Sequence, residues 1–179
     1  CPWWLGPILA NPLRRLIESP DRLLRPLVTP GITVLEPGCG MGFFTIPLAR
    51  LVGPGGRVIA LDLQPRMIEG LVRRARRAGV LGRIQASACD GAVLDVVDGS
   101  ADLAVAIHML HEVPDQARLL RQLHAALRPG GLLLIVEPQG PVTTADFAAT
   151  IERAGKAGFR DTHQPVGGRR LSAVLEKPA

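Results

Sequence analysis

The stretch that decides the fold lies at residues 33–43 and reads TVLEPGCGMGF. Its apolar start predicts a short β-strand over 33–35, and apolar residues at helical spacing predict a helix over 43–52. Between them, Glu36 precedes glycines at every second position, and glycine lets a backbone turn tightly and approach a ligand closely. The stretch therefore predicts a strand, a ligand-binding loop and a helix.

Two classes of ligand use such a loop, and the residues around the glycines distinguish them. Dinucleotide-binding loops follow G-x-G-x-x-G and hold a pyrophosphate at the helix N-terminus. Phe43 stands where the last glycine of that pattern belongs, and it would obstruct the close contact between helix and strand. Glu36 would also repel a pyrophosphate. The loop favours a ligand with an ammonium and a sulfonium group, S-adenosylmethionine, and a nicotinamide-dependent oxidoreductase is kept as the alternative.

Strands and helices alternate along the rest of the chain. Strands are expected over 58–62, 83–88, 103–107 and 132–136, helices over 65–78, 114–127 and 143–157, and two last strands over 159–163 and 171–175. The first five strands read as apolar runs, a pattern typical of strands buried on both faces of a parallel sheet. This order predicts an α/β fold with a three-layer, Rossmann-like doubly wound sheet, which binds ligands at the carboxyl ends of its strands.

Polar side chains end several of these strands. Asp62 ends the second strand, 20 residues after Gly42, where a carboxylate can accept hydrogen bonds from ribose hydroxyls. Asp90 ends the third strand, where its carboxylate can accept from the amino group of an adenine. His108 and Glu137 end the fourth and fifth strands. A core does not require polar residues at these places, so they predict a site.

The composition bounds the class of protein. The chain has 179 residues, 47% of them hydrophobic, which suffices for one domain with a buried core. Its 21 Lys and Arg against 16 Asp and Glu give a net charge of +5, but only 3% of the residues are aromatic. Nucleic-acid binders often combine basic patches with stacking aromatics, so nucleic acid is a disfavoured partner. Irregularly spaced cysteines favour a cytoplasmic protein, and no apolar stretch reaches the roughly 20 residues of an integral membrane segment.

The N-terminal segment is expected to be separate from the main domain. Asn11 and Ser19, each followed by proline, predict the starts of two short helices. Residues 1–31 are therefore expected to form a helical leader ahead of a cofactor-binding domain over 32–179. Two tryptophans near the N-terminus leave the use of this leader open between a lid over the active site and a homodimer contact.

These motifs resemble the class I S-adenosylmethionine-dependent methyltransferases over roughly residues 32–176. The segments LHEVPD at 110–115 and LRPGG at 127–131 resemble the small-molecule branch of that family, which includes methyltransferases of quinone biosynthesis. The resemblance implies seven strands, the last antiparallel and paired in a hairpin with the sixth. It also implies an enzyme that takes S-adenosylmethionine, releases S-adenosylhomocysteine and methylates a small-molecule acceptor. A non-catalytic S-adenosylmethionine sensor or a partner subunit of a larger methyltransferase is the alternative.

The resemblance also assigns roles to residues by their position. The cofactor-binding set that it implies is Glu36, Gly38, Cys39, Gly40, Gly42, Asp62, Leu63, Asp90, Gly91, Ile107 and His108. The acid and the first two glycines of the loop would hold the methionine part. The residues at 62 and 63 would contact ribose and adenine, those at 90 and 91 would border the adenine, and those at 107 and 108 would lie near the sulfonium.

The chemistry of the acceptor decides whether a base is needed. An oxygen or carbon acid must lose a proton, and His111 is the candidate base because histidine titrates near neutrality. A purely structural role for His111 is the alternative. His108, His111 and Glu112 do not match the H-E-x-x-H zinc pattern, so no metal site is predicted.

Two departures from the family narrow the acceptor. Residues 107–110 read IHML and lack the Asn/Asp-Pro-Pro-aromatic motif of the branch that methylates nucleic-acid bases. The connection at 139–141 leaves no room for the substrate-binding insertion of many relatives. The acceptor site must therefore come from the leader, from the loop after the fourth strand or from a second subunit.

Overall fold

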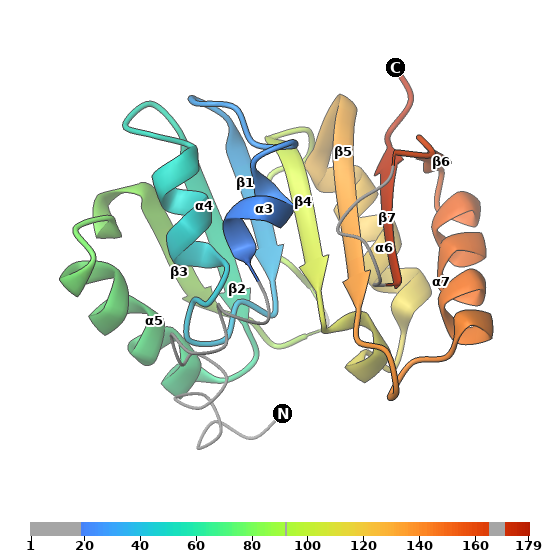
Figure 1. The fold of residues 1–179 in the computed structure, drawn as a ribbon, viewed down its shortest axis with the longest axis horizontal. Coiled ribbons are helices and arrows are strands. Elements are labelled where there is room, and N and C mark those ends of the chain that lie inside the picture. Colours follow the sequence, from blue (N-terminus) through green and yellow to red (C-terminus); the bar gives the residue numbers. More distant parts are fainter. Residues whose placement is uncertain (1–18, 92, 165–170) are drawn as a thin grey trace. The chain divides into compact units, whose positions relative to one another are not determined.

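The structure is a computed structural model that describes residues 19–91, 93–164 and 171–179 (Figure 1). The chain divides into two units after Leu94. The predicted helix at Asn11 and the tryptophans Trp3 and Trp4 lie outside the described residues.

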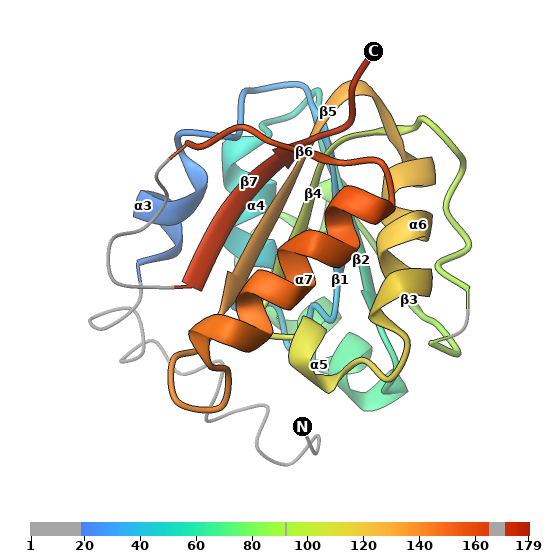
Figure 2. The ribbon, with the colours of Figure 1, turned by 90° about the vertical axis from the view of Figure 1, so that its right-hand side faces the viewer.

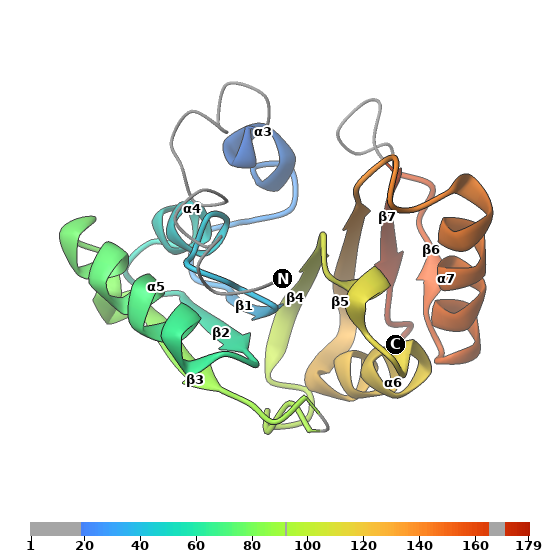
Figure 3. The same ribbon diagram turned by 90° about the horizontal axis from the view of Figure 1, so that it is seen from below.

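The described part of the first unit contains parallel strands in the spatial order β3-β2-β1. The strands are β1 (Thr33–Pro37), β2 (Arg57–Asp62) and β3 (Ile84–Ala88). The helices are α3 (Pro20–Leu24), α4 (Thr45–Leu51) and α5 (Pro65–Arg77), and a 3-10 turn covers Leu81–Arg83. Figure 3 shows α4 and α5 beside these strands. The predicted alternation of strand and helix is confirmed here.

Helix α5 shows how the sequence pattern produces the packing. Met67, Leu71 and Ala75 are buried and form a stripe at helical spacing. Arg73 and Arg77 are exposed on the other side of the helix. These two arginines therefore lie in solvent while the apolar stripe packs toward the strands, and the half-buried Arg74 donates a hydrogen bond to the Met41 carbonyl in the glycine-rich loop.

Strand β3 differs from the prediction that the first five strands are buried on both faces. Gln85, Ser87 and Ala88 are exposed. The reason is position, because β3 begins the strand order and has a neighbour, β2, on one side only. Polar residues at an edge remain in contact with water at no cost, whereas β1 and β2 have buried interiors.

The described part of the second unit has the strand order β4-β5-β7-β6. The strands are β4 (Ala101–Ile107), β5 (Leu127–Glu137), β6 (Arg160–Asp161) and β7 (Leu171–Glu176). The helices are α6 (Gln116–Ala126) and α7 (Thr144–Lys156), and the 3-10 turn η3 covers Leu110–Glu112. Figure 2 shows α6 and α7 side by side, in agreement with their mutual contacts.

The pairing of β7 confirms the most specific topological expectation. β4 and β5 are parallel, whereas β7 runs antiparallel to both β5 and β6. The seven strands of the two units, with the last one antiparallel, are the set that the resemblance implied. In the described parts of the chain, no helix combines the length and apolar character that crossing a membrane requires.

Strand β5 begins earlier than predicted. The sequence predicted a helix through Leu127 and a strand from Leu132, whereas α6 ends at Ala126 and β5 starts at Leu127. The backbone of Lys177 explains the difference, since it pairs with Gly130 and Gly131 at 2.8 Å in both directions. Residues 128–131, which the sequence predicted to end the helix, therefore lie at the start of β5.

Candidate functional site

The glycine-rich loop joins β1 to α4, as predicted, and its glycines face two different environments. Gly40 has a φ of +53°, and a Cβ placed on it would meet no atom within 4 Å. Gly42 has a φ of +82°, and a Cβ there would collide with Cδ1 of Leu71 in α5. The loop therefore packs against α5 at Gly42 and leaves its backbone open at Gly40, where a ligand can approach closely.

Asp62 holds this loop in place. Its carboxylate is 9% exposed; Oδ2 accepts a hydrogen bond from the Gly40 N–H and Oδ1 accepts one from the Gln64 N–H, each at 2.9 Å. A carboxylate offers about four acceptor positions, so each oxygen can still accept from a ribose hydroxyl. The bracing of the loop is not predicted from the sequence, although a carboxylate at the end of the neighbouring strand is a signal for it.

Glu36 lies at the end of β1 with a buried oxygen that lacks a partner. The residue is 4% exposed, and within the described ranges Oε2 makes no hydrogen bond. Burial raises the pKa of Glu36 to about 8; the neighbouring Thr45 hydroxyl opposes this shift and the negative charge of Asp62 adds to it. A buried polar atom without a partner is costly, so this carboxyl group is suited to receive a cationic group of a ligand.

The residues expected near the adenine also come together in the first unit. Leu63 follows Asp62 directly and is 62% exposed, unusual for so large an apolar side chain. A Cβ on Gly91 would lie 2.7 Å from Cδ2 of Leu63, so this leucine covers the loop after β3. Asp90 is exposed, and its Oδ1 accepts a hydrogen bond from the Val93 N–H at 3.1 Å.

Cys39 is a packing residue of the loop. It is 5% exposed, and burial raises the pKa of its thiol far above the ordinary range. Its N–H donates to the Leu61 carbonyl at 3.0 Å, and the Cys89 N–H donates to the Asp62 carbonyl at 3.0 Å. The loops after β1 and β3 are thus both tied to the end of β2. The contact of Cys39 with a cofactor stays a prediction, because its N–H bonds to Leu61 and its carbonyl accepts a hydrogen bond from the Gly42 N–H at 3.0 Å.

The predicted residues at 107, 108 and 111 belong to the second unit. Ile107 ends β4 and is 8% exposed. His108 has a φ of +55°, a left-handed conformation that is uncommon outside glycine, and its N–H donates to the Val136 carbonyl at 2.7 Å. The chain therefore turns sharply after β4, and the turn carries His111 in η3.

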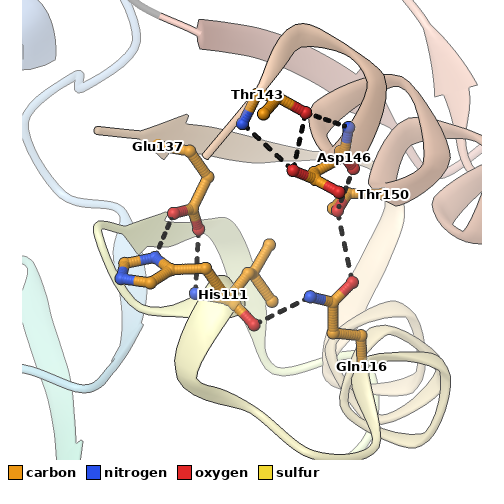
Figure 4. Close-up of polar contacts among 7 residues, drawn as sticks. His111, Gln116, Glu137, Thr143, Asp146 and Thr150 are labelled. Carbon is orange, nitrogen blue, oxygen red and sulfur yellow. Dashed lines mark hydrogen bonds and ion pairs between the residues drawn. The ribbon is translucent and has the colours of Figure 1, made fainter. Parts of the chain in front are cut away.

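His111 faces Glu137 at the end of β5 (Figure 4). Nδ1 of His111 contacts Oε2 of Glu137, and Oε1 of Glu137 accepts a hydrogen bond from the Leu110 N–H at 2.9 Å. The sequence predicts Glu137 at a strand end but not its pairing with His111. The pairing follows from the strand order, because β4 and β5 are parallel neighbours whose carboxyl ends meet at one edge.

The segment that carries His111 is also held from α6 and α7. The side-chain amide of Gln116 donates to the Leu110 carbonyl at 2.9 Å. The hydroxyl of Thr150 in α7 donates to Oε1 of Gln116 at 3.2 Å. Over the described ranges, no group of His, Cys, Asp and Glu is arranged to hold a metal ion.

Comparisons with known proteins find related sequences and structures. A sequence model of the family described as "Methyltransferase domain" matches residues 34–131, which is more than half of the chain. A protein of a Streptomyces fradiae transposon is 36% identical over 118 residues, covering 66% of this chain and 33% of that protein. The ubiquinone/menaquinone biosynthesis C-methyltransferase of Pasteurella multocida is 33% identical over 115 residues, covering 64% of this chain and 43% of that protein.

The fold comparison extends over nearly the whole chain. The crystal structure of a SAM-dependent methyltransferase from Aquifex aeolicus matches with a TM-score of 0.87 and 20% identity, covering 98% of this chain and 97% of that one. This likeness confirms the predicted Rossmann-like architecture. The chain spans less than half the length of these curated relatives. From the match over residues 34–131, which includes the glycine-rich loop and His111, we conclude that the chain belongs to the methyltransferase domain family.

Proposed function

We propose that this chain binds S-adenosylmethionine and transfers its methyl group to a small-molecule acceptor, leaving S-adenosylhomocysteine. The observation that carries the proposal is the buried, unpartnered Oε2 of Glu36 beside a loop whose backbone is open at Gly40. A carboxyl group in that place attracts the ammonium of a methionine moiety. In its ionised form it would repel the pyrophosphate of a nicotinamide dinucleotide.

The other residues of the first unit fit the remaining parts of the same molecule. Both carboxylate oxygens of Asp62 are fixed by backbone N–H groups and retain acceptor positions for ribose hydroxyls. Leu63 offers an exposed apolar surface for the adenine ring, with Asp90 and Gly91 beside it. The family resemblance adds Ile107 and His108 as neighbours of the sulfonium.

In this reaction the cofactor and the chain make different contributions. S-adenosylmethionine supplies an electrophilic methyl group when bound. The chain supplies the fixed position of the reactants, an effect that can be worth about 7–11 kcal/mol. His111 serves as the proton acceptor for the substrate.

The relatives support a class of acceptor. The Pasteurella multocida protein acts in ubiquinone/menaquinone biosynthesis by its name, which supports a small organic molecule as the acceptor here. We also propose that the chain acts in the cytoplasm, since Cys39 and Cys89 are free thiols. A homodimer is proposed as one way to complete the acceptor site.

Isothermal titration of the chain with S-adenosylhomocysteine tests the proposal. We expect binding, and we expect Asp62→Ala to weaken it. The matched control is Asp98→Ala, which removes an exposed carboxylate outside the proposed site and should leave the affinity unchanged. A folded chain that fails to bind S-adenosylhomocysteine but binds NADH would contradict the proposal.

Catalysis needs a separate measurement, because a sensor would also bind the cofactor. Transfer of a radiolabelled methyl group from S-adenosylmethionine to a panel of small acceptors distinguishes the two. Turnover of any acceptor supports the enzyme. Tight binding with no turnover across the panel would favour the sensor or partner subunit.

A further inference from the structure

The contact between His111 and Glu137 orients an imidazole ring (Figure 4). Nδ1 is the ring nitrogen that meets Oε2 of Glu137. With Glu137 ionised, its carboxylate only accepts hydrogen bonds, and Nδ1 is then the nitrogen that carries the hydrogen of this pair. In a neutral imidazole the other nitrogen, Nε2, then has a free lone pair and can accept a proton.

The two side chains of the pair differ in exposure. The Glu137 side chain is 2% exposed, whereas the His111 side chain is 27% exposed. The carboxylate is therefore enclosed in the second unit, while the ring keeps one side open. A proton acceptor that must reach a substrate needs this combination of a fixed inner nitrogen and an accessible outer one.

The carboxylate itself is held firmly. Its Oε1 accepts a hydrogen bond from the N–H of Leu110, the residue before His111, at 2.9 Å. The Leu110 carbonyl in turn accepts from Gln116, which is bonded to Thr150 of α7. Glu137 thus binds two consecutive residues, one through each oxygen. A movement of the His111 ring would therefore disturb both of these contacts.

A role confined to the fold would not need the imidazole. A buried carboxylate at a strand end is satisfied by backbone donors, such as the Leu110 N–H that already binds Oε1. Here the second oxygen contacts the partly exposed, titratable ring of His111, the middle residue of η3. This arrangement is the one that fixes a tautomer for proton transfer.

We propose that Glu137 is a positioning residue that holds His111 as the Nδ1–H tautomer, and that the acceptor is a hydroxyl or carbon acid that gives its proton to Nε2. The inference rests on the proposed function, because it assigns the substrate class of that reaction. A thiolate arrives without a proton to lose and would make no use of such a pair.

The step balances in atoms and charge. The acceptor O–H or C–H gives its proton to Nε2 of His111, which becomes an imidazolium beside the Glu137 carboxylate. The electron pair left on the acceptor forms the new bond to the methyl carbon. The bond from that carbon to sulfur breaks with its electron pair on sulfur, so the sulfonium charge is lost as the proton charge appears on His111. The imidazolium then releases its proton to water.

Nuclear magnetic resonance of the ¹⁵N-labelled chain tests the pair without any cofactor. Long-range ¹H–¹⁵N correlations distinguish the ring nitrogens, and His111→Gln assigns the signals among the chain's 4 histidines. In the neutral ring we expect a protonated Nδ1 and a bare Nε2. A neutral ring with its hydrogen on Nε2 in the wild-type chain would overturn the proposal.

Variants show whether Glu137 sets this state. Glu137→Gln should give a mixture of tautomers or the reversed one. The matched control is Glu112→Gln, which removes an exposed carboxylate next to His111 in the sequence and should keep the wild-type tautomer. A wild-type spectrum in the folded Glu137→Gln chain would contradict the positioning role.

Methyl transfer tests the substrate class. The probes are catechol as a hydroxyl acid, 1,3-cyclohexanedione as a carbon acid and thiophenol as a thiol. With catechol or 1,3-cyclohexanedione as acceptor, we expect kcat to fall about 10²-fold or more in His111→Gln and Glu137→Gln. Transfer to thiophenol should show no such fall. Transfer to thiophenol alone, or to none of the probes, overturns the assignment.

Different results would contradict the proposed function and the inference about His111 and Glu137. A wild-type chain that does not bind S-adenosylhomocysteine would overturn the proposed function, whatever the tautomer of His111. A chain that binds it normally but shows the wrong tautomer, or equal losses with thiophenol and catechol, would overturn this inference alone.

Discussion

The Gly40 N–H donates a hydrogen bond of 2.9 Å to Oδ2 of Asp62, so the end of β2 holds the loop that follows β1. These two residues are 22 positions apart in the sequence. The same carboxylate also binds the Gln64 N–H and thereby supports the start of α5. A residue predicted to contact a ribose is therefore also part of the frame of the site.

Asp62→Ala should lower the stability of the chain in the absence of any ligand. Two backbone N–H groups lose their acceptor, and each such loss typically costs about 1–3 kcal/mol when the groups stay out of water. Urea unfolding measures the change in the free energy of unfolding. Asp98→Ala, at an exposed position, should leave this free energy nearly unchanged, and equal effects of the two substitutions would refute the bracing role.

Glu36 should make the stability of the chain depend on pH. Burial raises its pKa from 4.5 to about 8 in the folded state, so the folded chain binds this proton more tightly than the unfolded chain. Below pH 4.5 both states are protonated and the group has no effect. Between these values unfolding releases the proton, so stability falls as pH rises, and the loss levels off above pH 8.

Glu36→Gln tests this dependence because an amide does not ionise. Relative to wild type, the variant should gain free energy of unfolding as pH rises, by at most about 1.4 kcal/mol for each unit of pKa shift. Urea unfolding across this pH range gives the two profiles. Glu69→Gln, on the exposed side of α5, should follow the wild-type profile. Parallel profiles for wild type and Glu36→Gln would show that this carboxyl group is not responsible.

Binding of S-adenosylhomocysteine should release a proton from Glu36. At about pH 7 most of the ligand-free chain carries this proton, since the pKa is about 8. The ammonium of the ligand favours the carboxylate form, so binding expels the proton. Titration in two buffers with different ionisation enthalpies counts the protons released. The count should drop in Glu36→Gln, and an unchanged count would exclude Glu36 as the ammonium partner.

Gly40→Ala and Gly79→Ala form a matched pair. Both glycines have a positive φ, of 53° and 70°, and a Cβ on either would meet no atom within 4 Å. Each substitution should therefore cost a similar amount of stability, about 1–2 kcal/mol for a left-handed alanine. Only Gly40 lies in the predicted cofactor loop. Titration should show weaker S-adenosylhomocysteine binding by Gly40→Ala, and equal affinities would argue against a close approach at Gly40.

The sequence was informative where local pattern and chemistry coincide. The strand at 33–35, the glycines and the carboxylate of Asp62 follow from composition, spacing and the rule that ligands bind at strand ends. The antiparallel β7 followed from the resemblance and could not be derived from local periodicity. The exposure of β3 was not predicted because it depends on which strand lies at the edge of the sheet. Local sequence does not determine the order of the strands.

The pairing of His111 with Glu137 was out of reach for a related reason. The residues are 26 positions apart, and Glu112, adjacent to His111, was the more obvious partner in the sequence. Neighbouring residues point in different directions, whereas the ends of parallel strands converge. Only the β4–β5 pairing, with Ile107 beside Val136, shows that the end of β5 faces the turn that carries His111.

The division of the chain after Leu94 has a consequence for how such an enzyme can diversify. Most of the residues assigned to the cofactor precede this boundary, and the proposed proton-transfer pair follows it. We therefore expect substitutions around η3 and the end of β5, where the proposed pair lies, to change the methyl-transfer step more than the binding of the methyl donor.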